Sequence, residues 1–140
     1  MNYCITIPGA PYPLKRPRRA KNGGMFDPKE NVAAKQVMAW QARTVIKTPI
    51  EGPVRVRIHF FFARPKSHYG KYLKPSAPNC HTQKPDVDNL VKAIFDGFNG
   101  VAWVDDTQVV EVVARKEWAD IFEPSTRVDI CLVETERVSA

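Results

Sequence analysis

The sequence predicts an α+β fold in which one mixed sheet of about five strands carries two helices on one face. Segments that alternate between polar and apolar residues predict the strands. Two segments with helical periodicity and with start or stop signals predict the helices. The elements follow the order strand, helix, strand, long loop, helix and three strands, which favours a sheet covered by helices. All 140 residues are expected to form a single domain.

The first half of the chain begins with an alternating strand over residues 2–8. A first helix is predicted from the segment "DPKE", where Asp27 is expected to be the N-cap, to about Lys47. The face that this helix buries is expected to consist of Val37, Met38, Trp40, Val45 and Ile46. The segment "PVRVRIHFFF", residues 53–62, alternates strongly and predicts a half-buried strand.

The second half of the chain begins with a helix predicted over residues 88–98. Its apolar stripe consists of Leu90, Ile94 and Phe98, and the pair Asn99-Gly100 is expected to stop it. Three further strands are predicted, over residues 101–104, about 108–118 and about 126–134.

The charges are distributed very unevenly. The net charge is +6, but residues 1–85 contain 16 Lys/Arg and only 3 Asp/Glu, whereas residues 86–140 contain 5 and 12. This asymmetry predicts an anionic partner that is held by the first region. Nucleic acid is favoured over an acidic membrane surface, because no basic amphipathic helix with an apolar face is present in the sequence.

Two segments concentrate the cations, a basic arm at about residues 9–24 and a basic loop at about residues 63–85. Tyrosines between the loop cations suit stacking on bases, although they would equally suit pinning the loop to its own domain. A merely solvated arm is the alternative for the first segment. The residues expected to contact DNA are Lys15, Arg16, Arg18, Arg19, Lys21, Arg64, Lys66, Tyr69, Lys71, Lys74 and Lys84.

Several classes of protein are disfavoured by what the sequence lacks. No run of about 18 apolar residues predicts a membrane span, and the first residues do not resemble a secretory signal. The 3 cysteines are scattered, which fits a reducing cytoplasm better than a disulfide framework. No phosphate-binding glycine loop with its lysine is present, so no nucleotide cofactor is expected.

Acidic residues gather at two places in this otherwise basic chain. Asp86 and Asp88 lie at the start of the second predicted helix, and Asp105 and Asp106 lie at a predicted turn between strands. Three carboxylates converge if the sheet brings that turn beside the helix start. Like charges in contact raise one another's pKa, and a divalent cation removes this penalty. Asp86, Asp88 and Asp106, with Asp105 as a possible further ligand, therefore predict a Mg²⁺ site.

Lys92 lies one turn after Asp88, on the same face of the predicted helix. Its ammonium group is placed to neutralise charge on a phosphodiester under attack. Simpler roles remain open for each residue alone: Asp88 as an N-cap, Lys92 as an ion-pair partner, and Asp105 and Asp106 as turn formers. Two acidic pairs are more than one cap requires, which favours the metal site.

The segments "KPDVDNLVKAIFDGF" and "VAWVDDTQVVE" resemble the RusA-like Holliday junction resolvases. The resemblance extends to "ITIPGAPYPLKRPRR" and "RPKSHYGKYLKPSAPNCHTQKPD" and so covers most of the chain. It implies a small homodimeric endonuclease with a mixed sheet and flanking helices, which requires Mg²⁺ or Mn²⁺ and cuts four-way DNA junctions by symmetric nicks. The family occurs in bacterial genomes and in phages, so a prophage origin is compatible with it.

The resemblance also implies roles for individual residues. The first acidic pair of the family falls on Asp86 and Asp88, its later essential aspartate on Asp106, its active-site lysine on Lys92, and its asparagine on Asn89. One departure concerns the segment before the acidic pair. The best-known members carry an arginine cluster there, whereas this chain has "HTQKP", with Lys84 as the one cation.

These observations together predict a metal-dependent endodeoxyribonuclease that resolves four-way junctions in DNA recombination and repair. A homodimer is expected, because two sites related by a dyad suit a substrate that needs paired cuts. One alternative is a non-catalytic, structure-selective DNA-binding protein with a degenerate acidic site. A phosphohydrolase of small nucleotides is a second alternative, but such a substrate does not need a large cationic surface.

Overall fold

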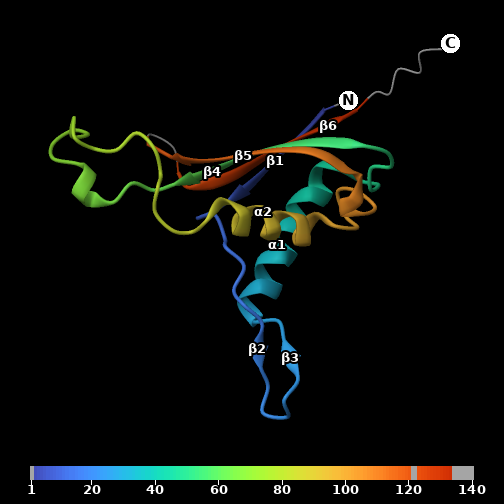
Figure 1. Cartoon of the computed structure of the whole chain (residues 1–140). Helices are drawn as coiled ribbons and strands as arrows, with labels where there is room; N and C mark the ends of the chain where they lie inside the picture. The colour runs from blue at the N-terminus through green and yellow to red at the C-terminus, as the bar shows by residue number, and fades with distance from the viewer. Residues whose placement is uncertain (1, 121–122, 134–140) are drawn as a thin grey trace.

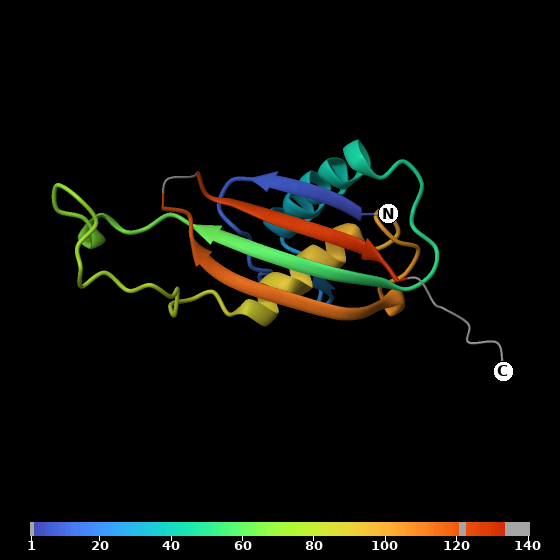
Figure 2. The ribbon, with the colours of Figure 1, turned by 90° about the horizontal axis from the view of Figure 1, so that it is seen from above.

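The fold is built on a mixed sheet of four strands, in a computed structural model that describes residues 2–120 and 123–133. The strands lie in the order β1 (Asn2–Pro8), β6 (Ser125–Leu132), β4 (Val54–Phe62) and β5 (Val109–Trp118). Strand β6 is antiparallel to both of its neighbours, whereas β4 and β5 are parallel. Figure 2 shows the four strands side by side.

Two helices, α1 (Lys29–Val45) and α2 (Val87–Phe98), pack on one face of the sheet (Figure 1). The predicted α+β class and the placement of both helices on one face are therefore confirmed. Neither helix in the described part of the chain is long and apolar enough to span a bilayer.

The core lies between the helices and the sheet, and strand β4 shows how the sequence pattern creates it. Val54, Val56 and Ile58 are fully buried, whereas Arg55 and Arg57 between them are exposed on the other face. Burying such aliphatic side chains stabilises the fold by about 1.5–3 kcal/mol each. The core residues from the helices are Met38, Ala42, Leu90, Ala93, Ile94 and Phe98.

A close contact at Gly97 brings the two helices together. A Cβ atom at this position would lie 2.7 Å from the Cβ atom of Met38. Any other side chain at residue 97 would therefore push α2 away from α1. This contact fixes the orientation of α2, which carries the acidic pair at its start.

The strand predicted over residues 101–104 is wrong, so the part of the chain that the structure describes forms a main sheet of four strands rather than about five. Gly100 has a φ of +75° and turns the chain directly after α2. Trp103 is then completely buried against Phe95 and Phe98, which form edge-to-face contacts with it. The end of the last predicted strand, residue 134, lies outside the described residues.

The prediction for the start of α1 also needs correction. The helix begins at Lys29, and Pro28 occupies the N-cap position without a side-chain cap. The carboxylate of Asp27 instead accepts hydrogen bonds from the side chains of Asn31 and Lys35.

The buried face of α1 is narrower than the sequence predicts. Met38 and Ile46 are buried as expected, but Val37, Trp40 and Val45 are exposed, and Trp40 is 63% exposed. The core side of this helix is completed by small or polar residues such as Ala42, which hydrophobicity does not reveal.

The basic arm predicted at about residues 9–24 leads into an element that the sequence did not reveal. Strands β2 (Arg18–Arg19) and β3 (Met25–Phe26) pair antiparallel and form a short hairpin. Figure 1 shows this hairpin projecting from the body, while the long loop after β4 leaves in another direction and the start of α2 lies between them.

Candidate active site

A groove of about 640 Å³ lies at the start of α2, between the root of the basic arm and the end of the basic loop. It gathers residues that the sequence predicts as metal ligands, as a catalytic lysine and as phosphate contacts. The residues that line the groove are Pro13, Leu14, Lys15, Arg16, Lys84, Pro85, Asp86, Asp88, Asn89 and Lys92.

The carboxylates of Asp86 and Asp88 are exposed, and neither takes part in an ion pair or side-chain hydrogen bond with any residue that the structure describes. Asp86 occupies the N-cap position of α2 but makes no capping bond. Lys92 does not pair with Asp88 in the described chain. The simpler roles as cap and ion-pair partner are thus not realised, and both carboxylates stay free for a hard cation.

Two side chains hold the walls of this groove. The side-chain amide of Asn89 donates a 3.0 Å hydrogen bond to the carbonyl of Leu14 and so fixes the arm to α2. The ammonium of Lys116 donates to the carbonyls of Gln83, at 2.6 Å, and Pro85, at 3.0 Å. Lys116 was missed from the sequence, although its position on the core-facing side of an alternating strand is a signal for a buried polar partner.

Asn31 anchors the arm to α1. It is 2% exposed, and its side-chain oxygen accepts hydrogen bonds from the hydroxyl of Tyr12 and the N–H of Lys15. Its amide group donates to the carbonyl of Lys15 and the carboxylate of Asp27. All four hydrogen-bonding positions of this amide are therefore occupied.

Asn31→Ala is expected to lower the free energy of unfolding by about 1–3 kcal/mol, because it leaves the part-buried hydrogen-bonding groups of Tyr12, Lys15 and Asp27 without their partner. Thermal unfolding followed by circular dichroism should show a midpoint several degrees lower. Asn79→Ala, at an exposed position, is the matched control and should leave the midpoint unchanged. Equal midpoints for both variants would contradict the anchoring role.

The structure places Asp106 at the other end of α2. Its N–H donates to the side chain of Asn99, and its carboxylate accepts a 2.7 Å hydrogen bond from the indole N–H of Trp103. The 12 residues of α2 make a helix about 18 Å long. Asp106 therefore does not join Asp86 and Asp88 within one chain, and the described residues contain no group of three or more His, Cys, Asp or Glu placed to hold a metal ion.

The surroundings of Asp106 favour a cation nearby. Burial raises the pKa of its carboxyl group, and the charges of Asp105 and Asp96 raise this pKa further against the opposing hydrogen bond from Trp103. Asp105 is engaged locally, since its carboxylate accepts from the hydroxyl of Thr107. Of the two neighbouring aspartates, Asp106 is thus the one whose charge is less well compensated.

Most residues of the basic loop after β4 that are predicted to contact DNA are exposed to solvent, but Arg64 is not. The guanidinium of Arg64 pairs with Asp120, donates to the carbonyl of Pro78 and stacks over Trp118, and its side chain is only 4% exposed. Its predicted role in DNA binding is therefore replaced by a structural one. The exposed lysines and tyrosines of the loop are Lys66, Tyr69, Lys71, Tyr72, Lys74 and Lys84.

His81 packs the second half of this loop onto the domain. Its ring stacks on Phe62 with centroids 4.2 Å apart and lies 4.5 Å from the ring of Trp118. Burial lowers the pKa of His81, and the charge of Lys116 lowers it further. The neutral imidazole is therefore the form that this contact accepts.

The pKa of His81 leads to a pH-dependent stability. The folded pKa of His81 lies below the unfolded value of about 6.5. Above that pH the imidazole is neutral in both states, so the cost of protonating it in the folded protein does not affect stability. The free energy of unfolding should then fall as the pH decreases through the folded pKa. His81→Phe keeps the stacking without the titration, so urea unfolding at pH 7 and pH 5 should show a smaller loss for the variant. Equal losses would contradict this explanation.

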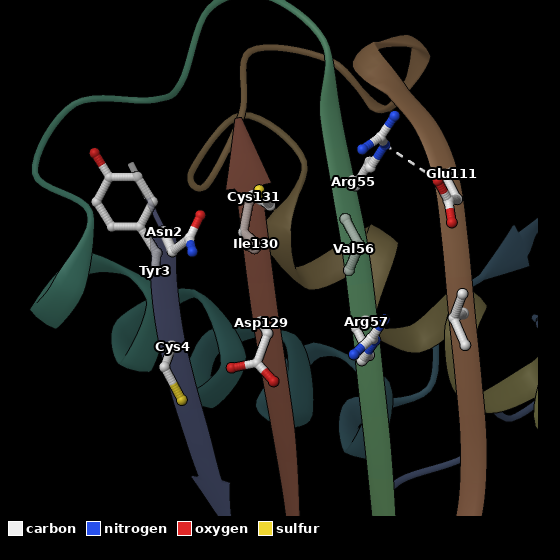
Figure 3. Close-up of a pocket in the computed structure, with 11 residues that line it drawn as sticks. Asn2, Tyr3, Cys4, Arg55, Val56, Arg57, Glu111, Asp129, Ile130 and Cys131 are labelled. Atoms are coloured by element: carbon white, nitrogen blue, oxygen red, sulfur yellow. Dashed lines mark ion pairs between the residues drawn. The ribbon is translucent and has the colours of Figure 1, made fainter. Parts of the chain in front are cut away.

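A second hollow, of about 450 Å³, lies on the uncovered face of the sheet (Figure 3). Its acids are already neutralised, because Glu111 pairs with Arg55 and Asp129 pairs with Arg127. It lacks the free carboxylates of the groove at α2 and is a poorer candidate for a metal site.

Comparison with known proteins relates the chain to a protein family and to a curated relative. Residues 8–131 match the family described as "Endodeoxyribonuclease RusA". The chain is also 35% identical over 137 residues to "Uncharacterized protein YqaN" of Bacillus subtilis (strain 168), covering 91% of this chain and 95% of that protein. The family match includes the groove, the basic loop and the turn with Asp106.

Proposed function

Because this chain belongs to the RusA endodeoxyribonuclease family, we propose that it is a metal-dependent enzyme that resolves four-way DNA junctions as a homodimer in the cytoplasm. Membership of this family implies, in general, endonuclease activity on Holliday junctions. The groove at the start of α2 is the observation that supports the finer statement, since it combines Asp86 and Asp88 with Lys92 and several cations.

The groove fits a divalent metal ion. Asp86 and Asp88 present oxygen atoms that no described residue occupies, and Mg²⁺ prefers such ligands together with water and substrate phosphate. When bound, Mg²⁺ or Mn²⁺ would supply a water of lowered pKa and stabilise charge on the phosphodiester.

The remaining residues of the groove would hold and orient the substrate. Lys92 would face the phosphodiester and stabilise the charge that develops during attack. Lys15, Arg16 and Lys84 would hold neighbouring phosphates, which makes binding salt-dependent. Asn89 would keep the root of the arm in place through its bond to the Leu14 carbonyl.

A second copy of the chain would complete the metal site. Asp106 precedes the first residue of β5, whereas Lys116, near the end of β5, contacts the segment directly before Asp86. The acidic pair and Asp106 therefore lie at opposite ends of both α2 and β5. A two-fold axis through the middle of these elements would bring Asp106 of the partner subunit to the acidic pair.

The flank formed by β5 and α2 suits such a contact. Strand β5 is an edge strand of the described sheet, and four valines along it and at the two ends of α2 are exposed. Their exposed fractions are 60% for Val110, 43% for Val112, 39% for Val87 and 56% for Val104. Covering an exposed apolar edge removes a surface that otherwise promotes aggregation.

A direct test incubates the protein with a mobile four-way junction, with Mg²⁺, with Mn²⁺ and with a chelator, and maps the nicks on denaturing gels. We expect paired, symmetric nicks that depend on the metal ion. Junction binding without cleavage under any divalent cation would instead support the alternative of a non-catalytic DNA-binding protein.

A further inference from the structure

We propose that the β2–β3 hairpin is a wedge that inserts Met25 and Phe26 between unstacked bases at a DNA branch point, while Arg18 and Arg19 hold the adjacent phosphates. This inference rests on the proposed function and adds to it a site for bases. The cations of the groove at α2 would contact phosphates alone, and phosphate contacts do not distinguish a branch from linear DNA.

The hairpin is a built element rather than a loose loop. Arg18 pairs with Phe26 and Arg19 with Met25. The tip is closed by hydrogen bonds from the N–H of Ala20 to the carbonyl of Gly24, at 2.7 Å, and from the N–H of Gly23 to the carbonyl of Ala20, at 3.0 Å. Gly23 has a φ of +86°, which a tight turn of this kind requires.

The side chains of the hairpin are exposed although they are apolar. Met25 is 64% exposed and Phe26 is 46% exposed, so neither contributes to the core. Directly paired residues lie on the same face of a two-stranded ladder. Each face of the hairpin therefore carries one cation and one apolar side chain, Arg18 with Phe26 and Arg19 with Met25.

This combination matches the chemistry of a nucleic acid with disturbed stacking. The cations suit phosphates, since neither Arg18 nor Arg19 is paired with any described residue. An aromatic ring stacks on any base that is not already stacked, and apolar side chains are known to act as wedges between base steps. A branch point supplies such bases, whereas a continuous duplex must first be unstacked.

The position of the hairpin favours DNA over a lipid surface. Residues 13–16 of the same arm line the acidic groove, and the Asn31 anchor fixes the root from which the hairpin projects. A DNA backbone in the groove would therefore bring its neighbouring bases toward the hairpin. Two apolar side chains on a cationic ladder offer little area for insertion into a bilayer.

The experiment uses a four-way junction with 2-aminopurine at the branch point, without divalent cation so that cleavage does not occur. Wild-type protein should increase the fluorescence, because stacking quenches this base analogue. The Met25→Ala/Phe26→Ala double variant should lose the increase, and its preference for junction over linear duplex should fall by about tenfold or more. Phe26→Trp, which keeps a stacking ring, should retain both.

Trp40→Ala is the matched control, because Trp40 is exposed on α1 away from the hairpin. The proposal is overturned if the double variant keeps the fluorescence change and the preference, or if Tyr72→Ala removes them instead. It is also overturned if the double variant loses binding only to anionic vesicles. If the wild-type protein neither binds nor cleaves junctions, the proposed function itself is refuted. If the wild-type protein cleaves junctions and the double variant keeps the fluorescence increase and the junction preference, only the wedge is refuted.

Discussion

Asp88→Asn is expected to lower the rate of junction cleavage by roughly a thousandfold or more, with little effect on junction binding. The substitution removes a charged oxygen ligand and keeps the size of the side chain, so the metal ion that activates water is no longer held. The carboxylate of Asp88 is exposed and bonded to no described residue, so the fold should not change.

The measurement compares single-turnover cleavage with junction affinity for the same variant. Thermal unfolding should give the same midpoint for Asp88→Asn and for the wild type. Asp129→Asn, on the uncovered face of the sheet, is the matched control and should cleave normally. Cleavage at the wild-type rate by Asp88→Asn would remove this residue from the proposed metal site.

Much of the fold could be predicted because its patterns are local. The alternation of β4 follows from the period of a strand, and every second residue from Val54 to Phe60 is buried as expected. The stripe of Leu90, Ile94 and Phe98 is buried as the helical period predicts. The candidate residues of the groove could be predicted from the sequence for the same reason, since Asp86, Asp88 and Lys92 lie within two turns at the start of one helix.

The parts that were not predictable depend on tertiary contacts. The hydrogen bonds of Asn31 join residues of the arm and of α1 that are up to 19 positions apart, and no local pattern marks them. Arg64 carries the same charge as its neighbours in the basic loop, and only the packing of Trp118 and Asp120 shows that it is structural. The apolar run over residues 101–104 predicts a short buried strand, but a run of this length does not specify its backbone conformation, and Trp103 instead lies in a turn after α2.

The position of Asp106 shows a further limit of sequence reasoning. The spacing of the acidic pairs suggests convergence, but it does not show whether the chain returns to the start or remains at the end of α2. The structure places Asp106 at the end, held by Asn99 and Trp103. Convergence with Asp86 and Asp88 then requires a second subunit, which makes the proposal testable through subunit exchange.

Mixing the Asp88→Asn and Asp106→Asn variants is expected to restore nicking that neither variant shows alone. In a mixed dimer with shared sites, one site carries both substitutions, while the other combines an intact acidic pair with an intact Asp106. After random exchange about half of the dimers are mixed, so about a quarter of all sites are intact. The products should be single nicks rather than paired cuts, because only one site of each mixed dimer works.

The measurement follows cleavage of a four-way junction after the two variants are unfolded and refolded together. Mixing Asp86→Asn with Asp88→Asn is the matched control. Both of these residues belong to the same chain's share of the site, so every site in that mixture has a defect. If each site lay within one chain, the Asp88→Asn and Asp106→Asn mixture would also stay inactive. Restored nicking therefore separates a shared site from a site within one subunit, independently of how the dimer contact is formed.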